Sequence, residues 1–234
     1  MKSTIQDKTK LVNSVFSKVY KKYDLMNDIM SLGIHRIWKK KLIDWMNPQK
    51  NENLIDVASG TGDIAKLFSY RNDNFNQITC VEPNQNMYLA GKSNLINFKN
   101  VKWIKSQAEK IPLKNDSFDF YTISFGIRNV SNINLSLKEA FRVLKPGGRF
   151  MCLEFSKIDN ELINLLYHQY SKIIPLVGKY VVGSSKPYEY LVKSIDQFYS
   201  QDELVRLMKN NGFSNIEYRN LSNGISAIHS GWKI

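Results

Sequence analysis

The sequence predicts an α/β protein with a doubly wound, mostly parallel sheet. Between residues 53 and 155, short apolar runs alternate with segments of helical periodicity, a pattern typical of βαβ units. The first apolar run passes directly into a glycine turn and a helix. Near the end of the chain, two further strands flank Ser222-Asn223-Gly224. These two strands predict an antiparallel hairpin at the sheet edge, which brings the sheet to seven strands.

The first 155 residues supply most of these elements. Residues 1–50 have apolar side chains at helical spacing, with a break near Asp24 and a second helix over Ile34–Met46, before Pro48. The strands of the parallel part are expected at Leu54–Ala58, Ile78–Val81, Val101–Lys105, Phe118–Ser124 and Phe150–Leu153. The helices between them include Met87–Lys92 and Leu135–Leu144. Residues 145–148, Lys-Pro-Gly-Gly, predict a turn before the fifth strand.

After residue 155 the alternation stops. Residues 156–200 are aromatic, helical and interrupted by Pro and Gly, and a further helix ends at Gly212. The hairpin strands are expected at Ile216–Arg219 and Ile225–Ile228. No linker or repeat divides the chain. We therefore expect one domain over residues 1–234, with a helical cap at 1–50 and a helical insertion at 156–200.

The amino-acid composition narrows the possible binding partners and the cellular compartment of the protein. Cys80 and Cys152 fall in expected buried strands, no metal cluster is visible, and the first residues lack the apolar core of a secretory signal. These features predict a cytoplasmic protein. The net charge of +12 fits nucleic acid or an anionic membrane, but the lysines are evenly scattered, as an AT-rich genome alone would produce. The denser cluster Arg36–Lys41, which includes Trp38, is typical of an interfacial helix and equally of a solvated one.

The turn after the first strand predicts a nucleotide site. Gly60 and Gly62 allow close approach of a ligand to the backbone, and Glu82, twenty residues later, ends the second strand where it can bind ribose hydroxyls. A dinucleotide site prefers a third glycine, where this chain has Ala65. The acid before the glycines, Asp56, resembles instead the S-adenosylmethionine site of class I methyltransferases.

Further motifs resemble the UbiE-type family of ubiquinone/menaquinone biosynthesis C-methyltransferases. They are YDLMND at 23–28, MSLGIHRIWK at 30–39, SFGIRN at 124–129, LKPGG at 144–148, EFS at 154–156, YEYL at 188–191 and HSGWK at 229–233. The resemblance covers nearly the whole chain. Three residues depart from the family pattern: Ser59 replaces a glycine and fits if its φ is negative, Glu82 replaces an aspartate, and Gln107 replaces Asn or Asp.

The resemblance implies a C-methyltransferase. It would move a methyl group from S-adenosylmethionine to a ring carbon of a polyprenylated quinol, either 2-polyprenyl-6-methoxy-1,4-benzoquinol or demethylmenaquinol or both. Another small-molecule methyltransferase and a non-catalytic partner in a quinone-synthesis complex remain alternatives. Nucleic acid is not expected, because Ser124-Phe125-Gly126 is not the Asn/Asp-Pro-Pro-Tyr motif of base methyltransferases. Contact with the inner face of the membrane, contact with other quinone-biosynthesis enzymes, and a homodimer are left open.

The same resemblance assigns site residues. The cofactor-binding set is Asp56, Gly60, Thr61, Gly62, Glu82, Gln107, Ala108 and Ser124, with Met87 near the adenine. The catalytic set is Tyr23, Arg128 and Asn129. Arg128 is expected beside the acceptor ring, so that its removal would lower turnover and leave stability intact. Two histidines are weaker candidates for a base: His35, expected on an exposed helix face, and His168. The insertion at 156–200 would bind the substrate and line a groove for the polyprenyl tail.

Overall fold

The computed structural model describes residues 23–71, 76–158, 160–182 and 185–234, together with Val12, Ser14 and Ser17. Within them the strands are β1 (Leu54–Val57), β2 (Ile78–Val81), β3 (Val101–Ile104), β4 (Phe118–Ser124), β5 (Leu144–Phe155), β6 (Ser214–Leu221) and β7 (Ser226–Trp232). The helices are α2 (Tyr23–Ser31), α3 (His35–Met46), α4 (Asp63–Arg71), α5 (Gln85–Asn94), α6 (Ile133–Val143), α7 (Glu161–Val182), α8 (Lys186–Asp196) and α9 (Gln201–Asn210). The helix expected before Asp24 lies almost wholly outside the described residues.

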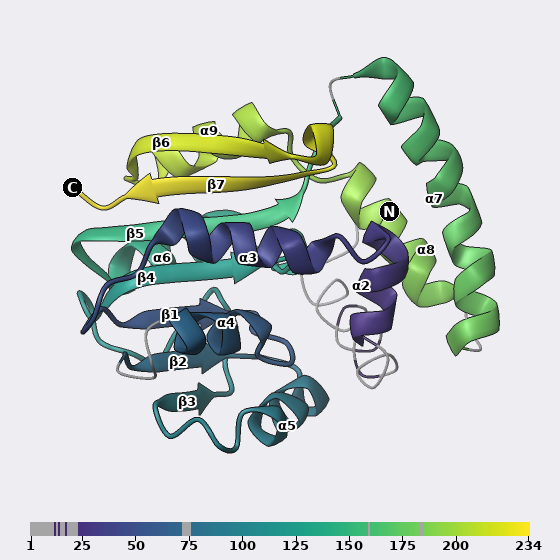
Figure 1. Ribbon diagram of the computed structural model, residues 1–234. Coiled ribbons are helices and arrows are strands. Elements are labelled where there is room, and N and C mark those ends of the chain that lie inside the picture. Colours follow the sequence, from purple (N-terminus) through teal and green to yellow (C-terminus); the bar gives the residue numbers. More distant parts are fainter. Residues whose placement is uncertain are drawn as a thin grey trace.

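The strands form one sheet in the order β3-β2-β1-β4-β5-β7-β6 (Figure 1). β1 to β5 pair in parallel, whereas β7 runs antiparallel to both β5 and β6. The predicted mostly parallel sheet with a C-terminal hairpin is therefore confirmed. The chain moves outward from β1 to β3 and then returns to β4 on the other side of β1. Ligands of doubly wound sheets bind at such a reversal, beyond the carboxyl ends of the strands.

Helices cover both faces of the sheet. α3 and α4 lie over one face, and α6 and α9 lie over the other (Figure 1). β1 and β2 are buried at every position, including Asp56 and Thr79 in these otherwise apolar strands, because a parallel strand covered on both sides has no solvated face. On the first face Phe68 of α4 and Leu42 of α3 are fully buried, and on the second Leu137 of α6 and Met208 of α9 are.

β5 begins earlier than the sequence predicts. The expected turn Lys145-Pro146-Gly147-Gly148 is part of the strand, which starts at Leu144 rather than Phe150. Gly147 has φ +78, and its N–H donates to the carbonyl of Lys233 at 2.7 Å, while the Lys233 N–H donates to Gly148 at 3.0 Å. The glycine-rich segment thus pairs with the C-terminal tail, a long-range contact that local turn chemistry does not reveal.

One end of the molecule is built from helices. α2, α7 and α8 lie beyond the carboxyl ends of the parallel strands (Figure 1). The hydroxyl of Tyr170 in α7 donates to the carbonyl of Ile29 in α2, and Tyr188 of α8 is fully buried in the core. α7 continues through Pro175, where the sequence suggested an interruption. No helix among the described residues is long and apolar enough to cross a membrane.

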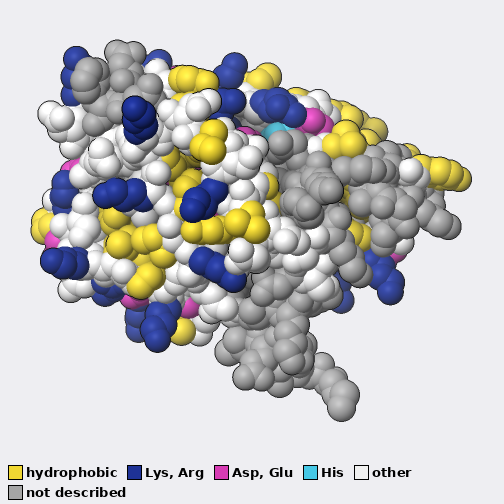
Figure 2. Space-filling model, turned by 90° about the horizontal axis from the view of Figure 1, so that it is seen from below, with side chains coloured by type: hydrophobic (Ala, Val, Ile, Leu, Met, Phe, Trp, Pro, Cys, Tyr) yellow, Lys and Arg dark blue, Asp and Glu magenta, His cyan; other side chains and the backbone are white. Residues whose placement is uncertain are grey.

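The basic side chains do not form one patch on the visible face of the molecule. Figure 2 shows Lys and Arg side chains scattered over the visible face among apolar and neutral ones. This distribution agrees with the even spacing of lysines along the sequence. The net charge of +12 therefore does not correspond to one basic groove on this face.

Candidate functional site

The glycine turn connects β1 to α4 through several left-handed residues. Gly60 has φ +57 and Gly62 has φ +93, conformations that glycine adopts without steric cost. Ala58 also has a positive φ, +53, which the sequence does not signal. Ser59 is not among the residues with positive φ, and its Oγ donates to the Asp56 carbonyl at 2.6 Å. Ser59 therefore fits the turn without a positive φ, which is the condition that the sequence analysis set for it.

Glu82 joins this turn to the loop after β2. Its Oε2 accepts from the Gly60 N–H at 2.9 Å, and its Oε1 accepts from the Asn84 N–H at 2.8 Å. Burial raises the pKa of Glu82 to about 7, although the two backbone hydrogen bonds oppose this shift. The carboxylate thus organises both loops in addition to any contact with a ligand.

A first cavity lies beside Glu82. It encloses about 750 Å³ including its open mouth, within the range of small-molecule sites. The lining residues are Val12, Ala58, Gly60, Glu82, Pro83, Asn84, Met87, Gln107, Ala108, Glu109, Phe125, Gly126, Asn129, Val130 and Ser131. Most of the expected ribose and adenine contacts thus share one cavity. Sequence reasoning missed Glu109, whose Oε1 accepts from the N–H groups of Ser131 and Asn132 and ties together two loops of the cavity.

A second, smaller cavity adjoins the first. It is lined by Lys39, Asp56, Ala58, Ser59, Gly60, Thr61, Asp63, Ile64, Ser124 and Phe125, and three of these residues line both cavities. The predicted residues Asp56, Thr61 and Ser124 are grouped here. Asp56 is 1% exposed, its Oδ1 accepts from Thr122 Oγ1 at 2.8 Å, and burial raises its pKa to about 7.

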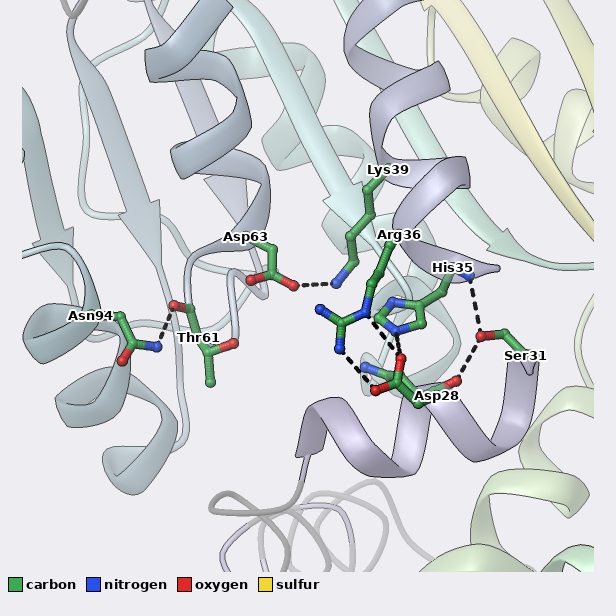
Figure 3. Close-up of polar contacts among 9 residues, drawn as sticks. Asp28, Ser31, His35, Arg36, Lys39, Thr61, Asp63 and Asn94 are labelled. Atoms are coloured by element: carbon green, nitrogen blue, oxygen red, sulfur yellow. Dashed lines mark hydrogen bonds and ion pairs between the residues drawn. The ribbon is translucent and has the colours of Figure 1, made fainter. Parts of the chain in front are cut away.

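Lys39 is the main residue of this site that sequence reasoning missed. Its side chain is 8% exposed, and its Nζ contacts Asp63 Oδ2 at 2.6 Å (Figure 3). The prediction that Lys39 and Trp38 belong to an exposed basic cluster is wrong, because the buried face of α3 runs through both. Trp38 is 2% exposed, and its indole N–H donates to Ser222. The available signal was spacing: Lys39 stands four residues after His35 and three before Leu42.

His35 lies next to this site but is not on an exposed face, so that expectation is wrong. It is 1% exposed, and its Nε2 contacts Asp28 Oδ1 at 2.8 Å (Figure 3). Arg36 binds the same carboxylate through Nη2 at 2.8 Å. Burial and the charge of Lys39 lower the pKa of His35, and the contact with Asp28 opposes them. The other histidine candidate, His168, is exposed on α7.

Arg128 is buried rather than open to an acceptor. It lies in a short 3-10 helix, η2 (Ile127–Asn129), where its Nη1 pairs with Glu154 of β5 and donates to the Phe125 carbonyl at 2.9 Å. The two paired side chains are 1% and 2% exposed. This burial argues against the expectation that removing Arg128 leaves stability intact and predicts a loss of stability instead, because a buried carboxylate would lose its counter-charge.

The two other predicted catalytic residues are placed differently. Asn129 lines the first cavity, and its Oδ1 accepts from the Tyr190 hydroxyl at 3.0 Å. Tyr23 is the first residue of α2, and its side chain lies outside the part of the chain that is described. Of the two members whose side chains are described, Arg128 and Asn129, Asn129 lines a cavity.

Solved structures with the same fold are methyltransferases. A structure from Thermotoga maritima, described as a SAM-dependent methyltransferase and possible histamine N-methyltransferase, superposes with a TM-score of 0.69 at 21% identity, covering 95% of this chain and 100% of that one. A phosphoethanolamine N-methyltransferase of Haemonchus contortus, solved with S-adenosylhomocysteine, gives 0.61 at 14% identity, covering 84% and 52%. At these identities the likeness establishes the fold, that of class I SAM-dependent methyltransferases.

Relatives in sequence are much closer. A protein of Rickettsia bellii named ubiquinone/menaquinone biosynthesis C-methyltransferase UbiE is 50% identical over 97% of this chain and 94% of its own length. Its namesake in Rickettsia prowazekii is 49% identical over 96% and 93%. The ubiE/COQ5 methyltransferase family profile matches residues 2–233. The chain therefore belongs to the ubiE/COQ5 methyltransferase family and is a SAM-dependent methyltransferase.

Proposed function

We propose that this protein transfers a methyl group from S-adenosylmethionine to a ring carbon of a polyprenylated quinol in ubiquinone or menaquinone biosynthesis. The acceptor is 2-polyprenyl-6-methoxy-1,4-benzoquinol, demethylmenaquinol or both. The names of the Rickettsia relatives support the substrate class. The observation that carries the proposal is the pair of adjoining cavities beside the glycine turn, which is lined by all of the residues expected to bind the cofactor except Gly62.

The residues present fit S-adenosylmethionine. In the first cavity Glu82 would bind the ribose, and Gln107, Ala108 and Met87 would contact the adenine. In the second, Thr61 and Ser124 would hold the methionine end, and the buried hydroxyl of Ser124 has no hydrogen-bond partner among the described residues. When bound, the cofactor supplies a methyl group on a positively charged sulfur, so no further activation of the donor is required.

The protein must then make the acceptor carbon nucleophilic. Loss of the hydroxyl proton places negative charge on the quinol oxygen and on the ring, and hydrogen-bond donors stabilise that charge. Asn129 faces the cavity and has an amide to offer. The positive charge of Arg128 is proposed to stabilise the same negative charge on the quinol. Its ion pair with Glu154 neutralises part of that positive charge. Tyr23 is proposed to join the proton path at the start of α2.

The helical end is proposed to cover the acceptor. α2 contacts α7, and α7 contacts α8, so the N-terminal cap and the insertion form one helical layer beyond the strands. Leu165, Leu166 and Ile173 of α7 are more than half exposed. A polyprenyl tail gains about 0.8 kcal/mol for each CH₂ that such apolar surface buries. The same end is proposed to touch an anionic membrane, since Leu32 and Ile37 are exposed beside Arg36.

One experiment tests the function directly. The purified protein is incubated with S-adenosylmethionine carrying a labelled methyl group and with a demethylated quinol of either ring type. Mass spectrometry should find the label on a ring carbon of the quinol, and calorimetry should show binding of S-adenosylhomocysteine without binding of NAD. Cofactor binding without methylation of either quinol would point to another small-molecule acceptor. Tight NAD binding would contradict the proposal altogether.

A further inference from the structure

Tyr190 connects the helical end of the molecule to the wall of the first cavity. It lies half-buried on α8, and its hydroxyl donates to Asn129 Oδ1 at 3.0 Å. α8 belongs to the insertion and packs on η2, the short helix that contains Asn129 and follows β4. This hydrogen bond therefore joins the segment expected to bind the acceptor to a residue that lines the cavity.

The contacts of the Asn129 amide determine which way it faces. Its Nδ2 donates to the Phe125 carbonyl at 3.4 Å, and a carbonyl oxygen can only accept. The amide oxygen therefore faces Tyr190, and the tyrosine hydroxyl supplies the proton of their hydrogen bond. The contact with Phe125 is long, and the same carbonyl also accepts from Arg128 Nη1 at 2.9 Å. Tyr190 thus makes the shorter of the two hydrogen bonds that hold the amide.

The environment of Tyr190 suits a donor rather than a base. Burial raises the pKa of its hydroxyl, the charge of Arg128 opposes this rise, and the charge of Glu154 adds to it. Tyr190 therefore keeps its proton at neutral pH. That proton is directed to Asn129, so the hydroxyl has no proton left for a ligand.

The amide of Asn129 keeps one donor for a ligand. Its second N–H has no acceptor in the part of the chain that the structure describes, and Asn129 lines the first cavity. A donor stabilises developing negative charge best when its direction is set before the reaction, because no reorganisation is then required. Without the hydrogen bond from Tyr190, the amide would keep only its long contact with Phe125 and would be free to turn.

We propose that Tyr190 is a positioning residue for the methyl transfer, whose hydroxyl holds the Asn129 amide so that its N–H points at the quinol oxygen that loses its proton. The residue acts through Asn129 and does not touch the acceptor. This assignment rests on the function proposed above. It adds a role for the insertion, which sets the direction of a hydrogen-bond donor in addition to covering the acceptor.

Turnover of Tyr190→Phe tests this role, because the variant loses the hydroxyl and keeps the ring. We expect kcat for quinol methylation to fall about 3- to 10-fold, as for the loss of one uncharged hydrogen bond. The KM for the quinol, the affinity for S-adenosylhomocysteine and the urea unfolding midpoint should stay unchanged. Tyr188→Phe is the matched control on the same helix. Tyr188 is fully buried, and its hydroxyl has no hydrogen-bond partner among the described residues, so its removal should leave kcat unchanged.

A double-mutant cycle separates positioning from direct contact. Asn129→Ala should lower kcat at least as much as Tyr190→Phe does. Adding Tyr190→Phe to Asn129→Ala should cause no further loss, because the hydroxyl then has no amide to hold. Losses that multiply in the double variant would show that Tyr190 acts on the acceptor independently of Asn129, and the assignment would be overturned.

The remaining outcomes also decide against the assignment. Equal losses of kcat in Tyr190→Phe and Tyr188→Phe would show that these hydroxyls only support the packing of α8. Weaker binding of S-adenosylhomocysteine in Tyr190→Phe would show that the hydroxyl supports the cofactor cavity instead. Methylation by the unaltered protein with an unchanged kcat in Tyr190→Phe would overturn the positioning role alone. If the unaltered protein methylates neither quinol, the proposed function fails and this assignment fails with it.

Discussion

At the scale of single residues, two carboxyl groups have pKa values well above those of ordinary carboxyl groups. Asp56 and Glu82 are both buried, and burial raises the pKa of each to about 7. Both residues end up at cavity walls because they stand on β1 and directly after β2, at the edge where the sheet binds ligands. Perturbed carboxyl groups in a cavity are typical of functional sites.

The pKa of Glu82 predicts how stability changes with pH. The folded pKa of about 7 lies above the ordinary value of 4.5, so the stability that protonated Glu82 contributes is complete below the ordinary value and is lost as pH rises through about 7. Glu82→Gln removes this titration. We expect the free energy of unfolding of the unaltered protein to fall more between pH 5 and pH 8 than that of the variant, by about 1–3 kcal/mol. Urea unfolding at both pH values measures the difference.

The same variant should also bind S-adenosylhomocysteine more weakly, by about 1–3 kcal/mol, because it loses a charged acceptor for the ribose hydroxyls. Equal pH slopes in the two proteins would show that Glu82 is ionised in the folded state throughout this range. Unchanged ligand affinity would instead remove Glu82 from the ribose contacts.

At the scale of elements, the pair between Arg128 and Glu154 attaches η2 to β5. The short helix has only three residues, so its position depends on this contact and on the hydrogen bond to Phe125. Tyr190 of α8 then reaches Asn129 from the helical end. The loop that lines the first cavity is therefore held from the sheet and from the insertion at the same time.

Removing one partner of the Arg128–Glu154 pair should lower the stability of the protein strongly, whereas replacing both partners should lower it less. We expect Arg128→Met or Glu154→Gln alone to destabilise the protein, with about 3–5 kcal/mol for the loss of Arg128, because a buried charge loses its partner. The double variant should be less destabilised than the sum of the two single changes. Urea denaturation of the four proteins measures the coupling.

The double variant also separates structure from chemistry at Arg128. If it folds but loses methyl transfer by about 100-fold or more, with S-adenosylhomocysteine affinity kept, Arg128 stabilises charge on the acceptor. If the double variant recovers methyl transfer together with stability, Arg128 only stabilises the fold and its catalytic role is refuted.

At the scale of the whole molecule, charge and apolar surface meet at one end. Lys40 and Lys41 are exposed on α3, and Leu32 and Ile37 are exposed near them. Because Trp38 and Lys39 are buried, the exposed part of this cluster is smaller than the sequence suggested. The membrane proposal thus depends on long-range attraction by the net charge together with a few local side chains.

Vesicle binding tests this proposal. The protein should sediment with anionic vesicles at low salt and be released as salt rises, because mobile ions screen the attraction. Replacing Lys40 and Lys41 by Glu should reduce binding more than replacing Lys138 and Lys209, exposed lysines on the opposite side of the sheet. Both pairs change the net charge equally. Equal reductions would show that only total charge matters, and equal binding to neutral vesicles would exclude the electrostatic argument.

The sequence by itself determined the architecture and the position of the glycine turn at which the cofactor is proposed to bind. The parallel strands β1 to β4 are predominantly apolar, and the glycines and Glu82 stand at fixed distances along the chain, so local pattern was sufficient. The strand limits of β2 and β4 agree with the prediction, as does the turn before β7. Ser59 also behaves as its negative φ required.

Only the tertiary structure decided how charged side chains are paired. Lys39 and Asp63 are 24 residues apart in sequence, and Arg128 and Glu154 are 26 apart. Whether such a residue faces solvent or a carboxylate depends on how α3, η2 and β5 pack, and not on its own neighbours in the chain. A lysine on an amphipathic helix resembles a surface residue until the opposing element supplies an anion. Burial and pairing of charge are properties of the assembled layers, because they arise only when distant segments exclude water together.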